Sequence, residues 1–218
     1  MNPLIVIPAY NSNNSINILI KKIIAKTDVQ ILVIDDGSTD KINIDNKNTV
    51  ILIRNNENKG KGMVLKKAIK YGVENNYTHI LSIDSDLQHD PIHINSFLKI
   101  DKNVDIVFGA REFSSPMPFH RILSNKITSY IISHLINHNI KDSQSGYRRY
   151  KLSIFKDKEL NENGFHFESE LILKCVNKNT IINHIPINTI YNNSISSISN
   201  FSDTIKFVKL IFRHCFVK

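Results

Sequence analysis

The chain has 218 residues, of which 41% are hydrophobic and 22% are charged, and its formal net charge is +8. This length and this balance predict a single globular domain with a sizeable core, and they exclude a disordered or membrane-spanning protein. No apolar run approaches the roughly 20 residues that cross a bilayer. The positive charge favours anionic partners, namely phosphate-bearing substrates, an anionic membrane face or nucleic acid.

The cysteines and the first residues bear on the cellular compartment. Cys175 and Cys215 lie far apart, without CxxC spacing or histidine partners, so we expect neither a zinc site nor a disulfide framework. The apolar stretch 4–8 is too short for a signal peptide and lacks a basic lead-in. We therefore expect a cytoplasmic protein, peripheral on the cytoplasmic membrane face if its substrate is a lipid.

The first half of the chain alternates strand-like and helix-like segments. Short apolar runs rich in β-branched residues predict strands, and the periodic segments between them predict helices. This alternation favours an α/β fold with a mainly parallel central sheet and helices on both faces, with ligands at the carboxyl ends of the strands. The expected strands are 4–8, 29–35, 49–53, 78–83 and 104–108, and the expected helices are 14–26, 60–75 and 91–100.

The second half is less regular, and its last segment is a basic helix. A helix over 119–139, a strand over 147–150, a helix over 167–178 and a polar linker over 194–200 are expected. We take residues 1–200 as one domain and 201–218 as an amphipathic helix whose apolar stripe packs on the core or lies in a membrane interface. The stripe is Phe201, Ile205, Val208, Phe212 and Cys215, and the basic face is Lys206, Lys209 and Arg213.

Two carboxylates follow the fourth predicted strand. Asp84 and Asp86 are separated by one residue, so both can face the same edge of the sheet. Hard oxygen ligands of this kind suit Mg²⁺ or Mn²⁺ that bridges a diphosphate. The alternative is an acidic loop that caps a helix, with Asp90 as the N-cap before Pro91. In this context we favour the metal site.

Other strand ends carry polar residues that would meet at the same edge. Asp35 and Asp36 can accept hydrogen bonds from a ribose or a base, although an ordinary Asp-Gly turn explains them equally well. The segment 58–62, Asn-Lys-Gly-Lys-Gly, can present N–H groups and lysine charge to a phosphate at a helix start, or it is a flexible basic turn. Its spacing is not that of a Walker P-loop.

The segment 142–149 is the fourth candidate. Arg148, with Arg111 and Arg121 upstream, suits bidentate recognition of phosphate, although surface arginines are usually just solvated. Asp142 can orient an acceptor or act as a base.

In their order along the chain, these motifs resemble a known family. IPAYN, VIDDGSTD, NKGKG, SIDSDLQHDP, GAR and DSQSGYR are similar to the family-2 glycosyltransferases of the dolichyl- or polyprenyl-phosphate mannose and glucose synthase group. The resemblance implies a GT-A fold. It also implies an inverting enzyme that uses Mg²⁺ or Mn²⁺ to move a hexose from a nucleotide sugar, of the GDP-mannose or UDP-glucose type, to a polyprenyl phosphate.

The resemblance also implies roles for individual residues. The nucleoside site would be lined by Pro8, Tyr10, Asp35 and Asp36, with Lys61 approaching it. The metal would be held against the diphosphate by Asp84, Asp86 and Gln88. Asp142 and Gln144 would lie beside the sugar and the acceptor, and Arg148 would lie near phosphate. Arg111 would contribute to the nucleotide-sugar site together with Asp84, and Arg121 is a further candidate. An acidic helix start behind the acceptor pocket would contain Glu168 and Glu170. Ser12 departs from the family, which commonly has Glu at that position.

The acceptor decides which chemistry is needed. A lipid phosphate is already an anionic nucleophile, so positioning, departure of the metal-bound nucleoside diphosphate and clamping by arginine would suffice. A glycan hydroxyl, as in cell-envelope polysaccharide synthesis, would need a base, which Asp142, Glu168 or Glu170 would have to supply. A non-catalytic nucleotide-binding module is a third hypothesis. The acidic strand ends would repel a nucleic-acid backbone, so we expect no nucleic-acid partner.

Overall fold

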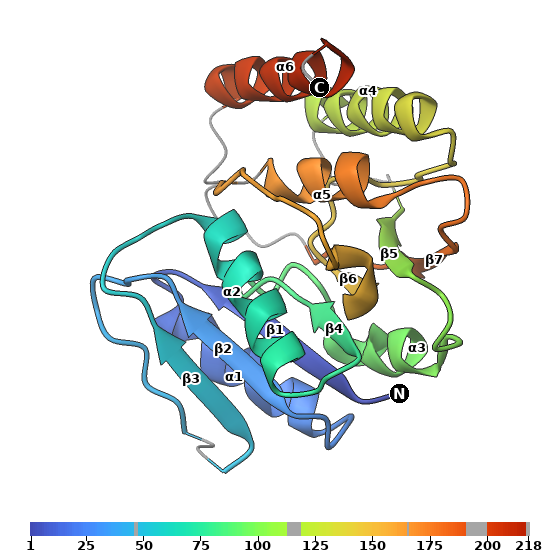
Figure 1. Ribbon diagram of the computed structural model, residues 1–218. Helices are drawn as coiled ribbons and strands as arrows, with labels where there is room; N and C mark the ends of the chain where they lie inside the picture. Colours follow the sequence, from blue (N-terminus) through green and yellow to red (C-terminus); the bar gives the residue numbers. More distant parts are fainter. Residues whose placement is uncertain (46–47, 113–118, 165, 191–199, 217–218) are drawn as a thin grey trace.

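A mixed β-sheet forms the centre of the molecule. The computed structural model describes residues 1–45, 48–112, 119–164, 166–190 and 200–216. The strands are β1 (Pro3–Ala9), β2 (Ile31–Asp35), β3 (Val50–Arg54), β4 (His79–Ser82), β5 (Ile106–Arg111), β6 (Arg148–Lys151) and β7 (Ile182–Ile187). Within the described residues they form one sheet in the order β3-β2-β1-β4-β6-β5-β7 (Figure 1). Neighbouring strands pair in parallel except at β6, which is antiparallel to both β4 and β5.

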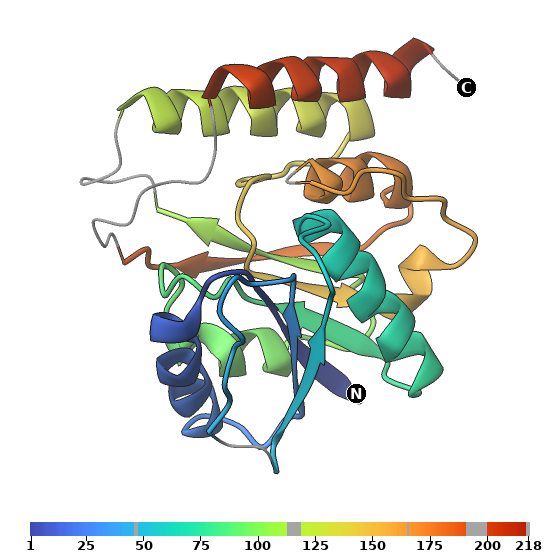
Figure 2. The same ribbon diagram turned by 90° about the vertical axis from the view of Figure 1, so that its left-hand side faces the viewer.

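Helices cover both faces of this sheet. They are α1 (Asn13–Ile24), α2 (Lys61–Glu74), α3 (Ile94–Lys99), α4 (Phe119–Ile136), α5 (Phe167–Cys175) and α6 (Asn200–Phe216), with the short 3₁₀ segments η1 (Pro91–His93) and η2 (Leu152–Phe155). The helices α1 and α3 lie on one face, and α2 and α5 lie on the other (Figure 2). The predicted α/β fold with a mainly parallel sheet and helices on both faces is therefore confirmed.

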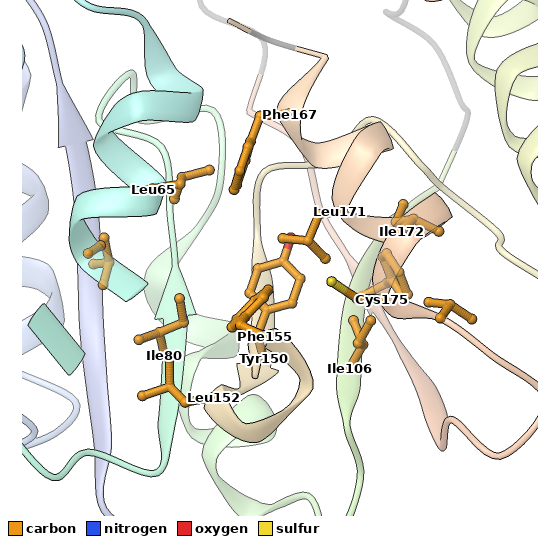
Figure 3. Packing of buried hydrophobic residues seen from close by; sticks show 14 of the residues in the cluster. Leu65, Ile80, Ile106, Tyr150, Leu152, Phe155, Phe167, Leu171, Ile172 and Cys175 are labelled. Atoms are coloured by element: carbon orange, nitrogen blue, oxygen red, sulfur yellow. The ribbon is translucent and has the colours of Figure 1, made fainter. Parts of the chain in front are cut away.

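The central strand β1 shows how one strand serves both layers. Leu4 and Val6 belong to the apolar cluster that lies towards α2 and α5, whereas Ile5 and Ile7 belong to the cluster under α1 and α3. All four side chains are fully buried. A strand covered on both faces reads as a continuous apolar run rather than as an alternation. Figure 3 shows part of the first cluster, where side chains of α2, α5 and the sheet pack together.

The strand β7 is not predicted by the sequence patterns. Asn183 and His184 interrupt its apolar run, and Pro186 has no N–H to donate to a neighbouring strand. The sheet tolerates Pro186 because β7 lies at the edge, where it pairs with β5 alone, and Pro186 is exposed. A proline is acceptable on an edge strand for this reason, so the missing N–H does not break the sheet.

The segment predicted as one helix over 91–100 begins as a 3₁₀ turn. The carboxylate of Asp90 accepts a hydrogen bond from the backbone N–H of Ile92 at 3.0 Å, and Pro91 occupies the first position of the turn. Proline suits this position because its missing N–H would have no partner there in any case. The capping role considered for Asp90 is therefore confirmed.

The helices α4 and α6 form a further layer beyond α5 (Figures 1 and 2). The described part of the apolar stripe expected on the last helix does not pack on the core, because Ile205, Val208 and Phe212 are all exposed. Instead, Phe207 and Leu210 contact the first apolar cluster. The helix therefore carries two apolar sides, of which one packs inwards and the other faces outwards.

Two expectations fall partly outside the described residues. Residues 194–199 of the predicted linker lie there, and so does the side chain of Phe201 in the predicted stripe. Within the described part, no helix combines the length and the apolar character that crossing a membrane requires.

His79, on β4, is a buried histidine whose pKa lies well below its ordinary value. Its ring is 2% exposed, and Nε2 lies 3.0 Å from the carbonyl oxygen of Lys102, to which it must donate. Burial, together with the charge of Arg149, lowers the pKa of His79 to about 4. Between about pH 6.5 and about pH 4, His79 binds more protons in the unfolded chain than in the folded protein. The stability that depends on neutral His79 is therefore complete above about pH 6.5 and is lost as the pH falls towards about 4.

We therefore expect acid to destabilise the protein through His79. Between neutral pH and about pH 4, this residue should cost roughly 3 kcal/mol of the free energy of unfolding, and His79→Gln should show a correspondingly smaller loss. Urea unfolding at several pH values measures this. His134→Gln, at an exposed position on α4, is the control that should keep the wild-type slope. An unchanged slope in His79→Gln would show that other groups control the acid sensitivity.

Candidate active site

Three strand ends and one helix start meet at the carboxyl edge of the sheet, as predicted. The backbone N–H of Asn11, after β1, donates to Ser38 Oγ, after β2, at 2.8 Å. Ser12 Oγ lies 2.8 Å from Ser85 Oγ, in the loop after β4. These hydrogen bonds join loops that are far apart in the sequence. Ser12, the position that departs from the family, therefore links the first motif to the Asp84–Asp86 loop.

Asp35 builds the turn that follows β2. Its side chain is 1% exposed, and Oδ1 accepts from both the N–H and the hydroxyl of Ser38. Arg54, at the end of β3, forms an ion pair with Oδ2 of Asp35 and also donates to the carbonyl oxygen of Ser38. Both carboxylate oxygens of Asp35 are thus directed at the protein itself, and its assignment to the nucleoside site stays a prediction.

Asp36 holds the basic segment that precedes α2. Its carboxylate, 3% exposed, accepts from the backbone N–H groups of Lys59 and Gly60 and from Asn55 Nδ2. Gly60 has a positive φ of 91°, a conformation that other residues rarely adopt. The segment is therefore a fixed turn rather than a flexible one, and this role of Asp36 was not evident from the sequence.

Lys61 is the cation at the centre of the site. Its ammonium lies 2.6 Å from Asp84 Oδ1 and 3.4 Å from Glu168 Oε1, so it joins the loop after β4 to the start of α5. Burial alone would lower the pKa of Lys61, but the charges of Asp84 and Glu168 raise it above its ordinary value. A methyl group on Gly146 would collide with both Asp84 and Lys61. Glycine is therefore required beside this ion pair, a constraint that the sequence analysis missed.

Asp84 and Asp86 fit a divalent ion only together with oxygens from a substrate. Asp86 as a whole is exposed, but neighbouring protein atoms partly shield its carboxyl from water; this desolvation, followed by the charge of Asp84, raises the pKa of Asp86. Asp86 Oδ1 accepts from the N–H of Gln88 at 2.9 Å, across Leu87 with its positive φ of 64°. No cluster of three or more His, Cys, Asp or Glu residues that could hold a metal is found among the described residues. Two carboxylates completed by phosphate oxygens are a usual magnesium site.

Asp142 is fully engaged by neighbouring donors. It is 0% exposed, and Arg111 Nε and Nη2 donate to its two oxygens at 2.6 and 3.0 Å. The backbone N–H groups of Arg111, Gln144 and Ser145 also point at this carboxylate. Burial would raise the pKa of Asp142, but the hydrogen bonds and charge of Arg111 lower it below its ordinary value. A carboxylate with five donors and a depressed pKa is a poor proton acceptor.

Arg148 is a buried arginine that is bonded to the loop containing Asp142. The side chain is 0% exposed, and Nε and Nη2 donate to the carbonyl oxygens of Ser145 and Ser143 at 2.5 and 2.7 Å. Its guanidinium also lies over the ring of Phe108, 5.1 Å from the ring centre. The role of Arg148 near phosphate stays a prediction. The structure shows Arg148 supporting the loop that contains Asp142.

The two glutamates of α5 have different surroundings. Glu170 accepts from the backbone N–H groups of Asn161 and Glu162 and pairs with Lys174 at 2.8 Å. Burial would raise its pKa, but these partners lower it. Glu168 is 7% exposed and its Oε1 has no hydrogen-bond partner in the described structure, although it is ion-paired with Lys61. Of the two, Glu168 is the one that faces the site.

The remaining predicted residues lie around this centre. Tyr10 is half exposed at the rim, and Pro8 is partly buried at the end of β1. Gln144 is exposed and donates to Thr128 Oγ1 of α4 at 3.2 Å. Arg121 is partly buried on α4. The structure thus brings together the acids, Lys61 and the Asp142 loop, and the binding roles of all these residues stay predictions.

The family follows from a comparison with known proteins. Residues 4–159 match the model of the family described as Glycosyl transferase family 2. The chain belongs to glycosyl transferase family 2. This family-2 glycosyltransferase is 29% identical to an uncharacterized protein of Methanocaldococcus jannaschii, over 98% of this chain and 99% of that protein. It is 23% identical to the polyprenol monophosphomannose synthase of Mycolicibacterium smegmatis, over 84% of this chain and 76% of that protein.

Solved structures show the same fold. A crystal structure of glucosyl-3-phosphoglycerate synthase from Mycobacterium tuberculosis, in complex with Mn²⁺, UDP-glucose and phosphoglyceric acid, superposes with a TM-score of 0.75. The match covers 99% of this chain and 80% of that chain, at 16% sequence identity. The fold of this family-2 glycosyltransferase is therefore of the GT-A type, as the motifs imply.

Proposed function

We propose that this family-2 glycosyltransferase moves a hexose from a nucleotide sugar to a polyprenyl phosphate, with inversion at the anomeric carbon. The observation that carries the proposal is the state of Asp142, one of the three candidate bases in the sequence. Its five hydrogen-bond donors and its lowered pKa leave it unsuited to remove a proton. A phosphate acceptor needs no such step, because it arrives as an anion.

The donor is assigned to the edge of the sheet where Asp84 and Asp86 lie. When a Mg²⁺ or Mn²⁺ ion is bound by these carboxylates and Gln88, it would neutralise the charge of the departing nucleoside diphosphate. Lys61 holds Asp84 in place from the other side through its 2.6 Å ion pair. The exposed ring of Tyr10 provides an aromatic surface at the rim for the nucleoside. The relative that acts in polyprenol phosphomannose synthesis, by its name, supports the choice of acceptor.

We place the acceptor beside the loop that contains Asp142. Arg111 is fixed there by two hydrogen bonds to Asp142, which leaves its side chain only 14% exposed. A guanidinium held in this way is preorganised to recognise an anionic group. Asp142 thus serves as a positioning residue for Arg111 rather than as a base.

A glycan hydroxyl is the alternative acceptor, and Glu168 is the observation that favours it. Its buried Oε1 has no hydrogen-bond partner among the described residues and lies 3.4 Å from Lys61. This oxygen accepts no hydrogen bond from the described residues, so a substrate hydroxyl that reaches it has an acceptor for its own hydrogen bond. A hydroxyl acceptor would therefore need Glu168 as its base, whereas a phosphate acceptor would not.

The experiment measures release of nucleoside diphosphate from GDP-mannose and from UDP-glucose, with and without Mn²⁺ or Mg²⁺. The acceptors are polyprenyl phosphate, the same lipid as a free alcohol, 3-phosphoglycerate and water alone. We expect release to require both the metal and the lipid phosphate, with a glycosyl phosphate lipid as the product. Turnover with the free alcohol or with 3-phosphoglycerate, and none with lipid phosphate, would refute the proposal.

Glu168→Gln separates the two acceptor classes. With a phosphate acceptor, the variant should keep kcat within about tenfold of the wild type and keep the same pH profile. With a hydroxyl acceptor, loss of the base should lower kcat by roughly a hundredfold or more and remove the rise of rate with pH.

A further inference from the structure

The helix α4 is built with its polar side inwards and its apolar side outwards over its first three turns. Asn125, Thr128 and Ser129 are all buried, whereas Leu123 is 48% exposed and Tyr130 is 73% exposed. A surface helix ordinarily buries its apolar stripe and exposes its polar residues. The exposed stripe consists of Phe119, Leu123, Ile127 and Tyr130.

The inward side of α4 is polar because it holds the loop that contains Asp142, beside which we place the acceptor. Ser129 Oγ donates to Ser143 Oγ and accepts from the backbone N–H of Ser143 at 2.9 Å. Thr128 accepts a hydrogen bond from the side chain of Gln144. Folding thus accounts for the buried side of α4, but it gives no reason for large apolar residues on the outer side. Contiguous exposed apolar surface of this kind marks an interaction site.

The outward side of α6 carries a second apolar stripe. The helix packs inwards through Phe207 and Leu210, and it leaves Val208 60% exposed and Phe212 58% exposed. A surface hollow of about 360 Å³ is lined by Val208, Lys209, Phe212 and Arg213, so apolar and cationic side chains share it. Both views of the fold show α6 beside α4 in the same outer layer (Figures 1 and 2).

The charge of the two helices is one-sided. The sequence of α4 contains Arg121 and Lys126 and no acidic residue. That of α6 contains Lys206, Lys209 and Arg213 against one acid, Asp203. A second copy of the chain would bring these like charges together, which is unfavourable. An anionic lipid surface satisfies both the apolar stripes and the positive charge.

We propose that the outer faces of α4 and α6 together form a docking surface for a bilayer of anionic phospholipid. The apolar side chains enter the boundary between headgroups and acyl chains, and the lysines and arginines contact lipid phosphates. Through Thr128 and Ser129, α4 holds the Asp142 loop directly behind this surface. Docking therefore brings the site to the level of the lipid headgroups. The reason for docking rests on the proposed function, but the binding itself can be tested separately.

The test is co-sedimentation of the full chain with vesicles of phosphatidylcholine alone, or mixed with phosphatidylglycerol. The wild type should bind the mixed vesicles, and this binding should weaken with salt, which screens the charges. Leu123→Asp combined with Phe212→Asp should weaken it by about tenfold or more. The matched control is Ile18→Asp combined with Val73→Asp, at positions that are similarly exposed on α1 and α2 and should leave binding unchanged.

Three results would overturn the docking proposal. The first is that the wild type does not bind the anionic vesicles. The second is that the control variant loses as much binding as the docking variant, Leu123→Asp/Phe212→Asp. The third is that the wild type binds no vesicles but forms a dimer in solution, which the docking variant converts to monomer.

Turnover with a water-soluble, short-chain isoprenyl phosphate separates this question from the proposed function. The docking variant should keep that turnover. Vesicle binding by a wild type that transfers no sugar to lipid phosphate would refute the proposed function and leave the docking surface standing.

Discussion

Asp86→Ala should lower kcat/KM for sugar transfer by about a thousandfold or more and abolish binding of Mn²⁺. The expected loss corresponds to roughly 4 kcal/mol of transition-state stabilisation, since the bound ion would no longer be held against the departing diphosphate. Asp86 is exposed, and its side chain accepts a local hydrogen bond from the N–H of Gln88 two residues away, so the variant should fold. Steady-state kinetics and titration with Mn²⁺ measure the two losses.

The melting temperature distinguishes a metal-binding role of Asp86 from a structural one. Without metal, Asp84 and Asp86 repel each other, and this repulsion contributes to the raised pKa of Asp86. The melting temperature of metal-free Asp86→Ala should therefore equal or exceed that of the metal-free wild type, and only the wild type should gain stability from Mn²⁺. Glu74→Ala, at an exposed acid on α2, is the control that should change neither quantity. Metal-dependent turnover in Asp86→Ala within tenfold of the wild type would remove this residue from the metal site.

Arg148→Met should destabilise the protein by roughly 3 kcal/mol or more. The variant leaves the carbonyl oxygens of Ser143 and Ser145 without their donors in a fully buried place, and it removes the cation over Phe108. Methionine fills much of the volume of the arginine side chain, so the loss of stability reflects the missing hydrogen bonds rather than a cavity. Urea unfolding at neutral pH measures the change in the free energy of unfolding.

Arg213→Met is the matched control for this prediction. Arg213 is an exposed arginine on α6 whose ion pair with Glu162 lies at the surface, so its loss should cost about 1 kcal/mol or less. If Arg148 instead contacts a substrate phosphate, Arg148→Met would be about as stable as the wild type and would lose only donor or acceptor binding. That result would support the role that the family resemblance implies for Arg148.

Much of the fold can be predicted from local patterns. The runs that become β1 and β2 are apolar without interruption, because both of their faces are covered, and such runs identify central strands of a parallel sheet. Asp84 and Asp86 follow β4, and Lys61 begins α2, at the edge where the parallel strands end, so their approach to one another could be expected as well. The order of the motifs was enough to indicate the family that the comparison then showed.

Pairing and burial could not be predicted in the same way. The antiparallel place of β6 between β4 and β5 depends on which strand edges meet, and β7 is accepted in spite of Pro186 only because it lies at the edge. Arg148 looks like a surface arginine in the sequence. Its burial depends on carbonyl groups of its own loop that become available only when the loop is folded.

The sequence by itself therefore determined most of the helices and strands of the first half of the chain, the mainly parallel character of the sheet and the chemical types at its carboxyl edge. These properties depend on neighbouring residues, whose spacing is visible in the chain. The tertiary structure alone decided which acids stay accessible. Asp35, Asp36 and Asp142 are buried and accept hydrogen bonds that include donors from other segments, whereas Asp86 is exposed. Residues of the same type differ in this way because the donors around a carboxylate come from segments that only folding brings together.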